Sequence, residues 1–290
     1  MYKLLNWIDI NKLNWDGLSE NSRAINLLEK NPDKINLNSV LQNSNGNYLV
    51  GNRMEIINFD YLSENPNIIY FLEKNVDKIN FSFLSLNPNA IHIIEQNLDK
   101  IDWVFLSENQ NAIHILEKNM DKIDWHRLSK NPKAIHLLNK NIDKIDWFEL
   151  SRNTEAIKIL ENNQDKINWK MLSLNKNAVH LLEKNIDKIN WDWISFNPNA
   201  IKIIEQNLDL INWKYFSYNA NCMEILYKNQ DKIYWYGFSL NTSIFELDYE
   251  ALKERCNIYK EELMQKAMHP SRIQKYLDLG YNIDELEDFI

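Results

Sequence analysis

Four histidines and two lysines recur at the same point of a 22-residue period. In chain order these residues are His92, His114, His136, Lys158, His180 and Lys202. If successive periods stack as helical layers about 9–10 Å apart, neighbouring imidazoles cannot share one metal ion, whose nitrogen ligands lie at about 2.0–2.1 Å. We therefore predict no metal site. We interpret the row as a weakly basic face that contacts a partner, with an ordinary solvated helix face as the alternative.

The other residues capable of chemistry are equally repetitive. A serine recurs at the fifth position of nearly every period, so no single serine stands out as a nucleophile. The carboxylates recur in like environments, whereas acid–base catalysis needs two carboxyl groups with different pKa values. The sequence contains no Gly-rich phosphate loop, no GxSxG and no HExxH motif. We predict no catalytic residue, no cofactor and no enzymatic activity.

The elements that position these residues follow from the period itself. Counting in steps of 22 from Trp15 reaches an aromatic residue or leucine every time, as far as Trp235. Ten full repeats occupy residues 15–234, and an eleventh stops near residue 245. Their consensus is W-x-x-L-S-x-N-P-x-A-I-x-L-L-E-x-N-x-D-K-I-[DN]. A fixed period of this length indicates a solenoid or a propeller, whose repeats must stack to bury their apolar side chains.

The consensus predicts two helices in each repeat. Asn at position 7 followed by Pro at position 8 matches an N-cap and the first residue of a helix. Apolar residues at positions 10, 11, 13 and 14 then form one stripe, and Asn at position 17 stops the helix in the left-handed conformation. Asp or Asn at position 22 caps a shorter helix that carries positions 1 and 4. We predict an all-α solenoid of about ten helix-turn-helix repeats with terminal caps.

An αβ solenoid of the leucine-rich type is the alternative, because Ile and Trp alternate around the polar residue at position 22. That pattern requires an apolar residue at position 2, where the chain has residues such as Asp16, His126 and Lys170. The helical solenoid is therefore favoured.

The two ends depart from the consensus. We predict that residues 1–14 form a partial repeat that acts as an N-terminal cap, residues 15–245 the solenoid and residues 246–290 a helical C-terminal cap. The ten stacked repeats are expected to make a rod or arc on the order of 90–100 Å long. The repeat at 37–58 keeps the period but loses its Trp, Ser and Ala and gains Gly46 and Gly51. We interpret it as a degenerate repeat, with a bend or a partner contact as the alternative.

Composition narrows the classes of partner. The net charge of −8 argues against a nucleic-acid backbone as the main partner. No stretch of 18 apolar residues occurs and the N-terminus shows no secretion signal, so we expect neither a membrane span nor export. Cys222 and Cys256 have no CxxC spacing and are expected to be reduced.

An aromatic cluster near the end of the repeats is a second candidate surface. A permanent interface exposes an apolar patch. The candidates for such a patch are Tyr215, Phe216, Tyr218, Tyr234, Tyr236 and Phe238.

The repeat LSENPNAIHIIEQNLDKIDW resembles the tandem repeats of many proteins of the nucleocytoplasmic large DNA viruses, the giant viruses of protists. The stretch IYKEELMQKAMHPSRIQKYLDLGYNIDELEDF resembles the tail that often follows such repeats. The resemblance implies a viral protein located in the host cytoplasm, at the viral factory, or in the virion. The resemblance implies no catalytic residues in this chain.

Our first hypothesis for the function is a non-enzymatic scaffold or adaptor that binds other viral or host proteins. The second is a structural subunit of a virion or of a viral multisubunit complex. The third is binding of RNA or single-stranded nucleic acid along the His/Lys row.

Overall fold

The computed structural model describes residues 1–46, 48–50, 59–267 and 269–280. The chain divides into a repeat body, Leu4–Phe245, and a terminal unit that combines Met1–Lys3 with Glu246–Ile290. The strands among the described residues are β1 (Tyr2–Leu4) and β2 (Phe245–Leu247), which pair with each other. The chain is therefore all-α, as predicted. The leucine-rich alternative is wrong, because the described part of residues 5–244 contains no strand.

Each repeat begins with a short helix at position 1, which we call its first helix. Leu at position 4 and Ser at position 5 are buried in these helices, whereas the aromatic residue at position 1 is only partly covered. The first helices are α1 (Trp15–Glu20), α3 (Leu37–Val40), α4 (Phe59–Glu64), α6 (Phe81–Leu84), α8 (Trp103–Glu108), α10 (Trp125–Ser129), α12 (Trp147–Arg152), α14 (Trp169–Leu172), α16 (Trp191–Ile194), α18 (Trp213–Phe216) and α20 (Trp235–Leu240).

In the repeats whose second helix is described, that helix begins at position 11 and buries position 14, and position 13 and the usual Ala at position 10 are mostly buried as well. We predicted a start at position 8, but positions 8–10 form a separate turn, which is a 3-10 helix in a minority of repeats, so the second helix is shorter than expected. The second helices are α2 (Ile25–Glu29), α5 (Ile69–Glu73), α7 (Ile91–Glu95), α9 (Ile113–Glu117), α11 (Ile135–Lys140), α13 (Ile157–Glu161), α15 (Val179–Glu183), α17 (Ile201–Glu205) and α19 (Met223–Lys228).

The residues that flank these helices confirm one capping prediction and correct another. Asp124, at position 22, accepts a hydrogen bond from the backbone N–H of Arg127 and so caps α10, as predicted. Asn119, at position 17, was expected in the left-handed region, but its φ is −135°. Its side-chain amide instead donates to the carbonyl oxygen of Ile115 at 2.9 Å. Asn at position 17 therefore ends the helix by satisfying a free carbonyl group.

The asparagine at position 7 joins each repeat to the one before it. In Asn153, which is 3% exposed, Nδ2 donates to the carbonyl oxygens of Ser129 and Asn131, while Oδ1 accepts from the N–H of Glu155. The same pairing recurs along the repeats, and at the junction of repeats 2 and 3 Asn65 donates to Leu41. Each amide forms hydrogen bonds with backbone groups of its own repeat and of the preceding one, which would otherwise be buried without a partner. We therefore attribute the recurrence of Asn at position 7 to packing rather than to ligand binding.

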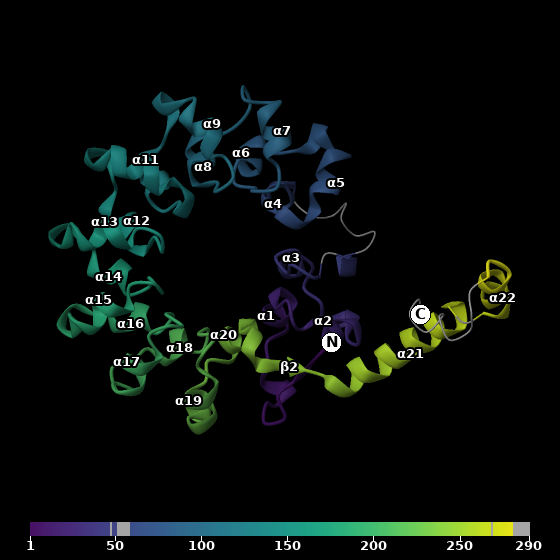
Figure 1. Ribbon diagram of the computed structural model, residues 1–290. Helices are drawn as coiled ribbons and strands as arrows, with labels where there is room; N and C mark the ends of the chain where they lie inside the picture. Colours follow the sequence, from purple (N-terminus) through teal and green to yellow (C-terminus); the bar gives the residue numbers. More distant parts are fainter. Residues whose placement is uncertain (47, 51–58, 268, 281–290) are drawn as a thin grey trace. The chain divides into compact units, whose positions relative to one another are not determined.

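This chain of asparagines closes on itself. Asn21 of the first repeat donates to the carbonyl oxygens of Ser239 and Asn241 in the last, at 2.9 and 3.0 Å. The backbone N–H of Asn14 donates to Ser239 Oγ at 2.8 Å, and α1 packs directly on α20. The first helices line the inside of this closed circuit and the second helices lie outside (Figure 1). The expectation of a rod or arc is wrong, because the two ends of the array bind each other.

Residues 5–14, which we call the closing segment, complete the eleventh repeat. Lys12 lies over the ring of Trp235, 5.3 Å from its centroid, as Lys at position 20 lies over the aromatic residue at position 1 in other repeats. Trp7 contacts the rings of Tyr227 and Phe238 at 5.4 and 5.8 Å. The C-terminal half-repeat 235–245 and the N-terminal closing segment therefore act together as one repeat.

The terminal unit is helical. It contains α21 (Tyr249–Ala267) and α22 (Pro270–Asp278), and within it Lys3 forms an ion pair with Glu246. His269 caps α22 by accepting from the N–H of Ser271, with Pro270 as the first helical residue, as its sequence suggests.

The divergent repeat 37–58 is described only in part, and Gly51 lies outside the described residues. Gly46 is needed for close packing, since a Cβ there would approach Val40 Cγ2 to 2.8 Å.

Candidate functional site

The first helices line the inside of the repeat body, and we call this surface the inner wall (Figure 1). It carries the side chains that differ most between repeats. Positions 4, 5, 7, 10, 13 and 14 are nearly constant and mostly buried, whereas positions 2, 3 and 6 of the first helices change from one repeat to the next. The varied side chains gather by type, with aromatic residues in repeats 9–11 and paired charges in repeats 5–7. Constant framework positions beside varied wall positions are typical of repeat proteins that bind through one surface.

The aromatic residues form a continuous stack, which we call the aromatic arc: Trp193, Phe196, Tyr215, Tyr218, Tyr234 and Tyr236. Trp193 and Tyr215 come from equivalent positions of successive repeats, and their rings are 6.0 Å apart with an interplanar angle of 11°. Phe196 lies 4.7 Å from Tyr215. None of these side chains is fully buried, so the arc offers ring edges and hydroxyl groups at the surface.

Two lysines lie over rings near the ends of the arc, and a glycine allows one of its tyrosines to pack closely. Lys170 Nζ lies 5.8 Å from the centroid of Trp193 at one end, and Lys214 Nζ lies 5.1 Å from that of Tyr234 near the other. Gly237 lets Tyr218 lie against the backbone, because a Cβ there would come within 2.4 Å of its ring. Gly237 therefore positions Tyr218.

Two phenols of the arc, Tyr218 and Tyr236, remain hydrogen-bond donors at neutral pH. Burial raises the pKa of Tyr218, and the neighbouring Tyr234, Tyr236 and Glu20 add to this effect. Burial also raises the pKa of Tyr236, followed by the negative charges of Glu20 and Asp16. Both hydroxyl groups can thus donate to a bound acceptor.

The charged part of the wall is largely self-paired. Glu108 binds Arg127, 2.8 Å away, and also Lys130. Burial opposes ionisation of Glu108, but hydrogen bonds from Lys130 and Arg127 outweigh it and lower the pKa of this carboxyl group. Glu149, which is 8% exposed, has Arg152 Nε 2.8 Å from Oε2, an ion pair outside hydrogen-bond alignment.

The predicted His/Lys row lies on the exposed side of the second helices. Each histidine of the row contacts a glutamate of the preceding repeat. The pairs are His92–Glu73, His114–Glu95, His136–Glu117 and His180–Glu161, at 2.8–3.0 Å. Lys158 and Lys202 are also exposed. Every histidine of the row thus has an acidic neighbour, which reduces the basic character that the sequence suggested.

The predicted aromatic interface is brought together only in part. Tyr215, Tyr218, Tyr234 and Tyr236 belong to the aromatic arc. Phe216 and Phe238 are fully buried, so their assignment to an interface is wrong. They occupy position 4, where other repeats have a buried leucine. Trp193 and Phe196 were missed, although their positions 3 and 6 match those of Tyr215 and Tyr218, and the period could have found them.

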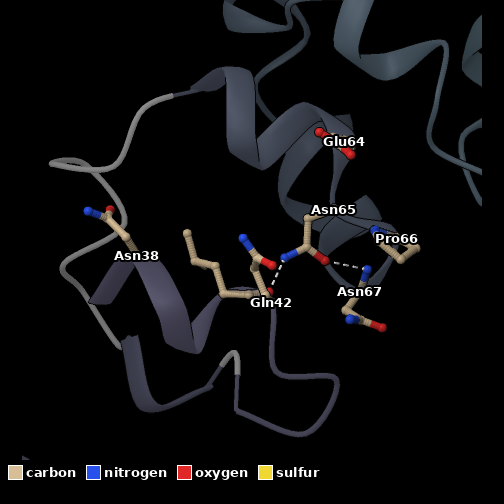
Figure 2. A pocket seen from close by; sticks show the side chains of 7 residues that line it. Asn38, Gln42, Glu64, Asn65, Pro66 and Asn67 are labelled. Atoms are coloured by element: carbon tan, nitrogen blue, oxygen red, sulfur yellow. Dashed lines mark hydrogen bonds between the residues drawn. The ribbon is translucent and has the colours of Figure 1, made fainter. Parts of the chain in front are cut away.

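Two hollows lie beside the residues at position 6. The first, a pocket of about 320 Å3, lies where repeat 2 meets repeat 3 (Figure 2). There Gln42 lies beside Asn65 and Asn67, with Glu64 above them and Asn38 on the far side of Gln42. The second, of about 450 Å3, runs over repeats 3–6, and we call it the position-6 groove. Its lining includes Glu64, Leu86, Asn89, Gln110, Asn111 and Lys130.

Groups of His, Cys, Asp and Glu that could hold a metal ion are not found among the described residues. None of the helices in the described ranges is long and apolar enough to cross a membrane. No family model, curated protein or solved structure matches the chain. Its class is therefore set by its own architecture, an all-α array of 22-residue repeats.

Proposed function

We propose that this protein is a scaffold that binds other proteins through the inner wall of its repeat body. The supporting observation is the separation of constant, buried framework positions from varied, accessible side chains that meet on one wall. The aromatic arc is the strongest candidate contact, because tyrosine and tryptophan supply large contact areas with little loss of conformational freedom. The resemblance to giant-virus repeats adds the proposal that the partners are viral or host proteins met during infection.

A comparison of two surface variants tests this proposal. The double variant Tyr234→Ala/Tyr236→Ala truncates two exposed rings of the arc, whereas Tyr70→Ala truncates a ring on α5, outside the wall, that is 69% exposed. Tagged wild-type protein and both variants are purified from infected cells, with and without nuclease, and their partners are compared by mass spectrometry. We expect a protein partner that survives nuclease and is lost only from the arc variant.

Equal loss from both variants, or no loss from either, contradicts binding through the inner wall. A partner retained at fixed stoichiometry favours the structural-subunit alternative. Partners that vanish with nuclease favour nucleic acid. In that case binding also falls steeply with salt, as expected of a protein that neutralises phosphates.

A further inference from the structure

The position-6 groove combines a free charge, an apolar contact and exposed amides. Glu64, at the end of α4, is exposed, and no hydrogen bond or ion pair holds its carboxylate within the described residues. Leu86 lies one repeat further along the groove. Beyond it Glu108 is already bound by Arg127 and Lys130. Among the described residues, one end of the groove therefore has no counter-charge for its carboxylate, whereas Arg127 and Lys130 neutralise the carboxylate at the other end.

The amides of the groove suit a peptide backbone. Asn89 donates one N–H to the carbonyl oxygen of Pro66, and Asn111 donates one to that of Pro88, at 2.9 and 2.8 Å. Both side chains are exposed, and each has a second N–H. Gln110 adds a further exposed amide. A side-chain amide both donates and accepts hydrogen bonds, as does each peptide group of an extended chain.

The repeat spacing also fits an extended chain. Packed helix layers lie about 8–10 Å apart. An extended chain in the polyproline II conformation advances about 3.1 Å per residue with three residues per turn, so every third side chain points in the same direction, about 9 Å further along. Every third residue of a bound segment therefore meets the same position of the next repeat. A side chain opposite Glu64 is followed three residues away by one opposite Leu86.

We infer that the position-6 groove binds an extended segment of a partner protein that carries a basic residue opposite Glu64 and an apolar residue three positions away opposite Leu86. This inference rests on the proposed scaffold function and names the chemistry of one partner segment. The occupant is basic because, within the described part of the chain, Glu64 is a groove carboxylate that no cation pairs with.

A designed peptide pair tests the spacing. The probe is Arg-Ala-Ala-Leu-Ala-Ala-Arg with blocked ends and a neutral fluorophore, which presents the same spacing in either chain direction. Its isomer Arg-Ala-Leu-Ala-Arg-Ala-Ala has the same composition and charge. We expect the full-length protein to bind the probe at least about threefold more tightly than the isomer, as measured by fluorescence anisotropy. Equal binding of the two peptides, or no saturable binding of the probe, overturns the inference.

Two matched variants test the charge. Glu64→Gln removes the free carboxylate at the end of α4, and Glu183→Gln removes an exposed carboxylate at the same point of a second helix, α15. We expect Glu64→Gln to weaken probe binding by about threefold to fivefold, as for an exposed ion pair, and Glu183→Gln to leave it unchanged. Equal effects of the two variants contradict a role for Glu64.

The groove inference and the scaffold function can fail independently of each other. If Glu64→Gln keeps the partner that the arc variant loses, and the probe does not bind, the scaffold function stands and the groove is not its binding site. If the probe binds with the expected spacing but no partner is captured, the groove inference stands and the scaffold function does not.

Discussion

At the scale of single residues, buried hydrogen bonds from the asparagines at position 7 join neighbouring repeats. Asn153 satisfies two carbonyl groups of the preceding repeat and one N–H of its own turn, all with the side chain out of contact with water. Buried polar groups that lose their partner cost about 1–3 kcal/mol each. The sequence showed that this Asn matters, but suggested only a helix cap, because a contact to a residue 24 positions earlier leaves no local signal.

Asn153→Ala should therefore destabilise the repeat body strongly. We expect the free energy of unfolding to fall by about 2–4 kcal/mol, because the buried carbonyl oxygen of Ser129 loses its donor Asn153 and that of Asn131 keeps only the N–H of Ala134. The measurement is urea-induced unfolding followed by circular dichroism. Asn177→Ala is the control, since Asn177 makes an exposed inter-repeat bond to Thr154 and should lose less than about 1 kcal/mol. Similar losses in both variants would show that burial of the amide is not the cause.

The two cysteines should differ in reactivity. Cys222 replaces the buried Ala at position 10, and burial raises the pKa of its thiol to about 12, so almost no thiolate forms at neutral or mildly alkaline pH. Cys256 is exposed on α21. We expect a thiol-specific disulfide reagent at pH 8 to modify one thiol per folded chain and two in denaturant. Rapid modification of both thiols in the folded protein would be incompatible with this burial. A Cys256→Ser variant identifies the reactive thiol.

At the scale of elements, the sequence predicts the two helices of each repeat and misses the ends of the array. Asp or Asn at position 22 and the apolar stripe are local signals, so the helices follow from them. The role of the closing segment is non-local. It carries Lys12, Leu13 and Asn14 at consensus positions 20–22, one repeat ahead of Trp15, which marks it as part of a repeat. What the sequence does not show is that its missing half lies at residues 235–245.

Truncating the closing segment at Trp7 should weaken the contact between the two ends. Trp7 is partly buried against Tyr227 and Phe238, and we expect Trp7→Ala to lower the free energy of unfolding by about 2 kcal/mol through lost apolar burial. Thermal unfolding and urea titration provide the measurement. Tyr249→Ala, which removes a ring that is 73% exposed on α21, should change stability by less than about 0.5 kcal/mol. A Trp7→Ala protein as stable as the wild type would mean that the closing segment does not hold the ends together.

At the scale of the whole repeat body, closure changes how the array is expected to open. An open solenoid frays from its terminal repeats, because each has only one neighbour. In this body α1 contacts both α3 and α20, and Asn21 binds the last repeat as Asn43 binds the first. The periodicity predicts stacking, but it cannot distinguish an open stack from a closed one. Closure depends on the small angle between neighbouring repeats, and this angle cannot be read from the sequence of a single repeat.

The protection of backbone amides against hydrogen exchange tests closure directly. We expect amides of α1 and α20 to be as protected as those of α10, in the middle of the chain, when exchange is followed by mass spectrometry of peptides. In Trp7→Ala, protection of α1 and α20 should fall first while that of α10 is kept, because loss of the closing contact creates two free ends. If α1 and α20 already exchange much faster than α10 in the wild-type protein, the array opens from its termini in solution. The hydrogen bonds of Asn21 to Ser239 and Asn241 would then not persist there.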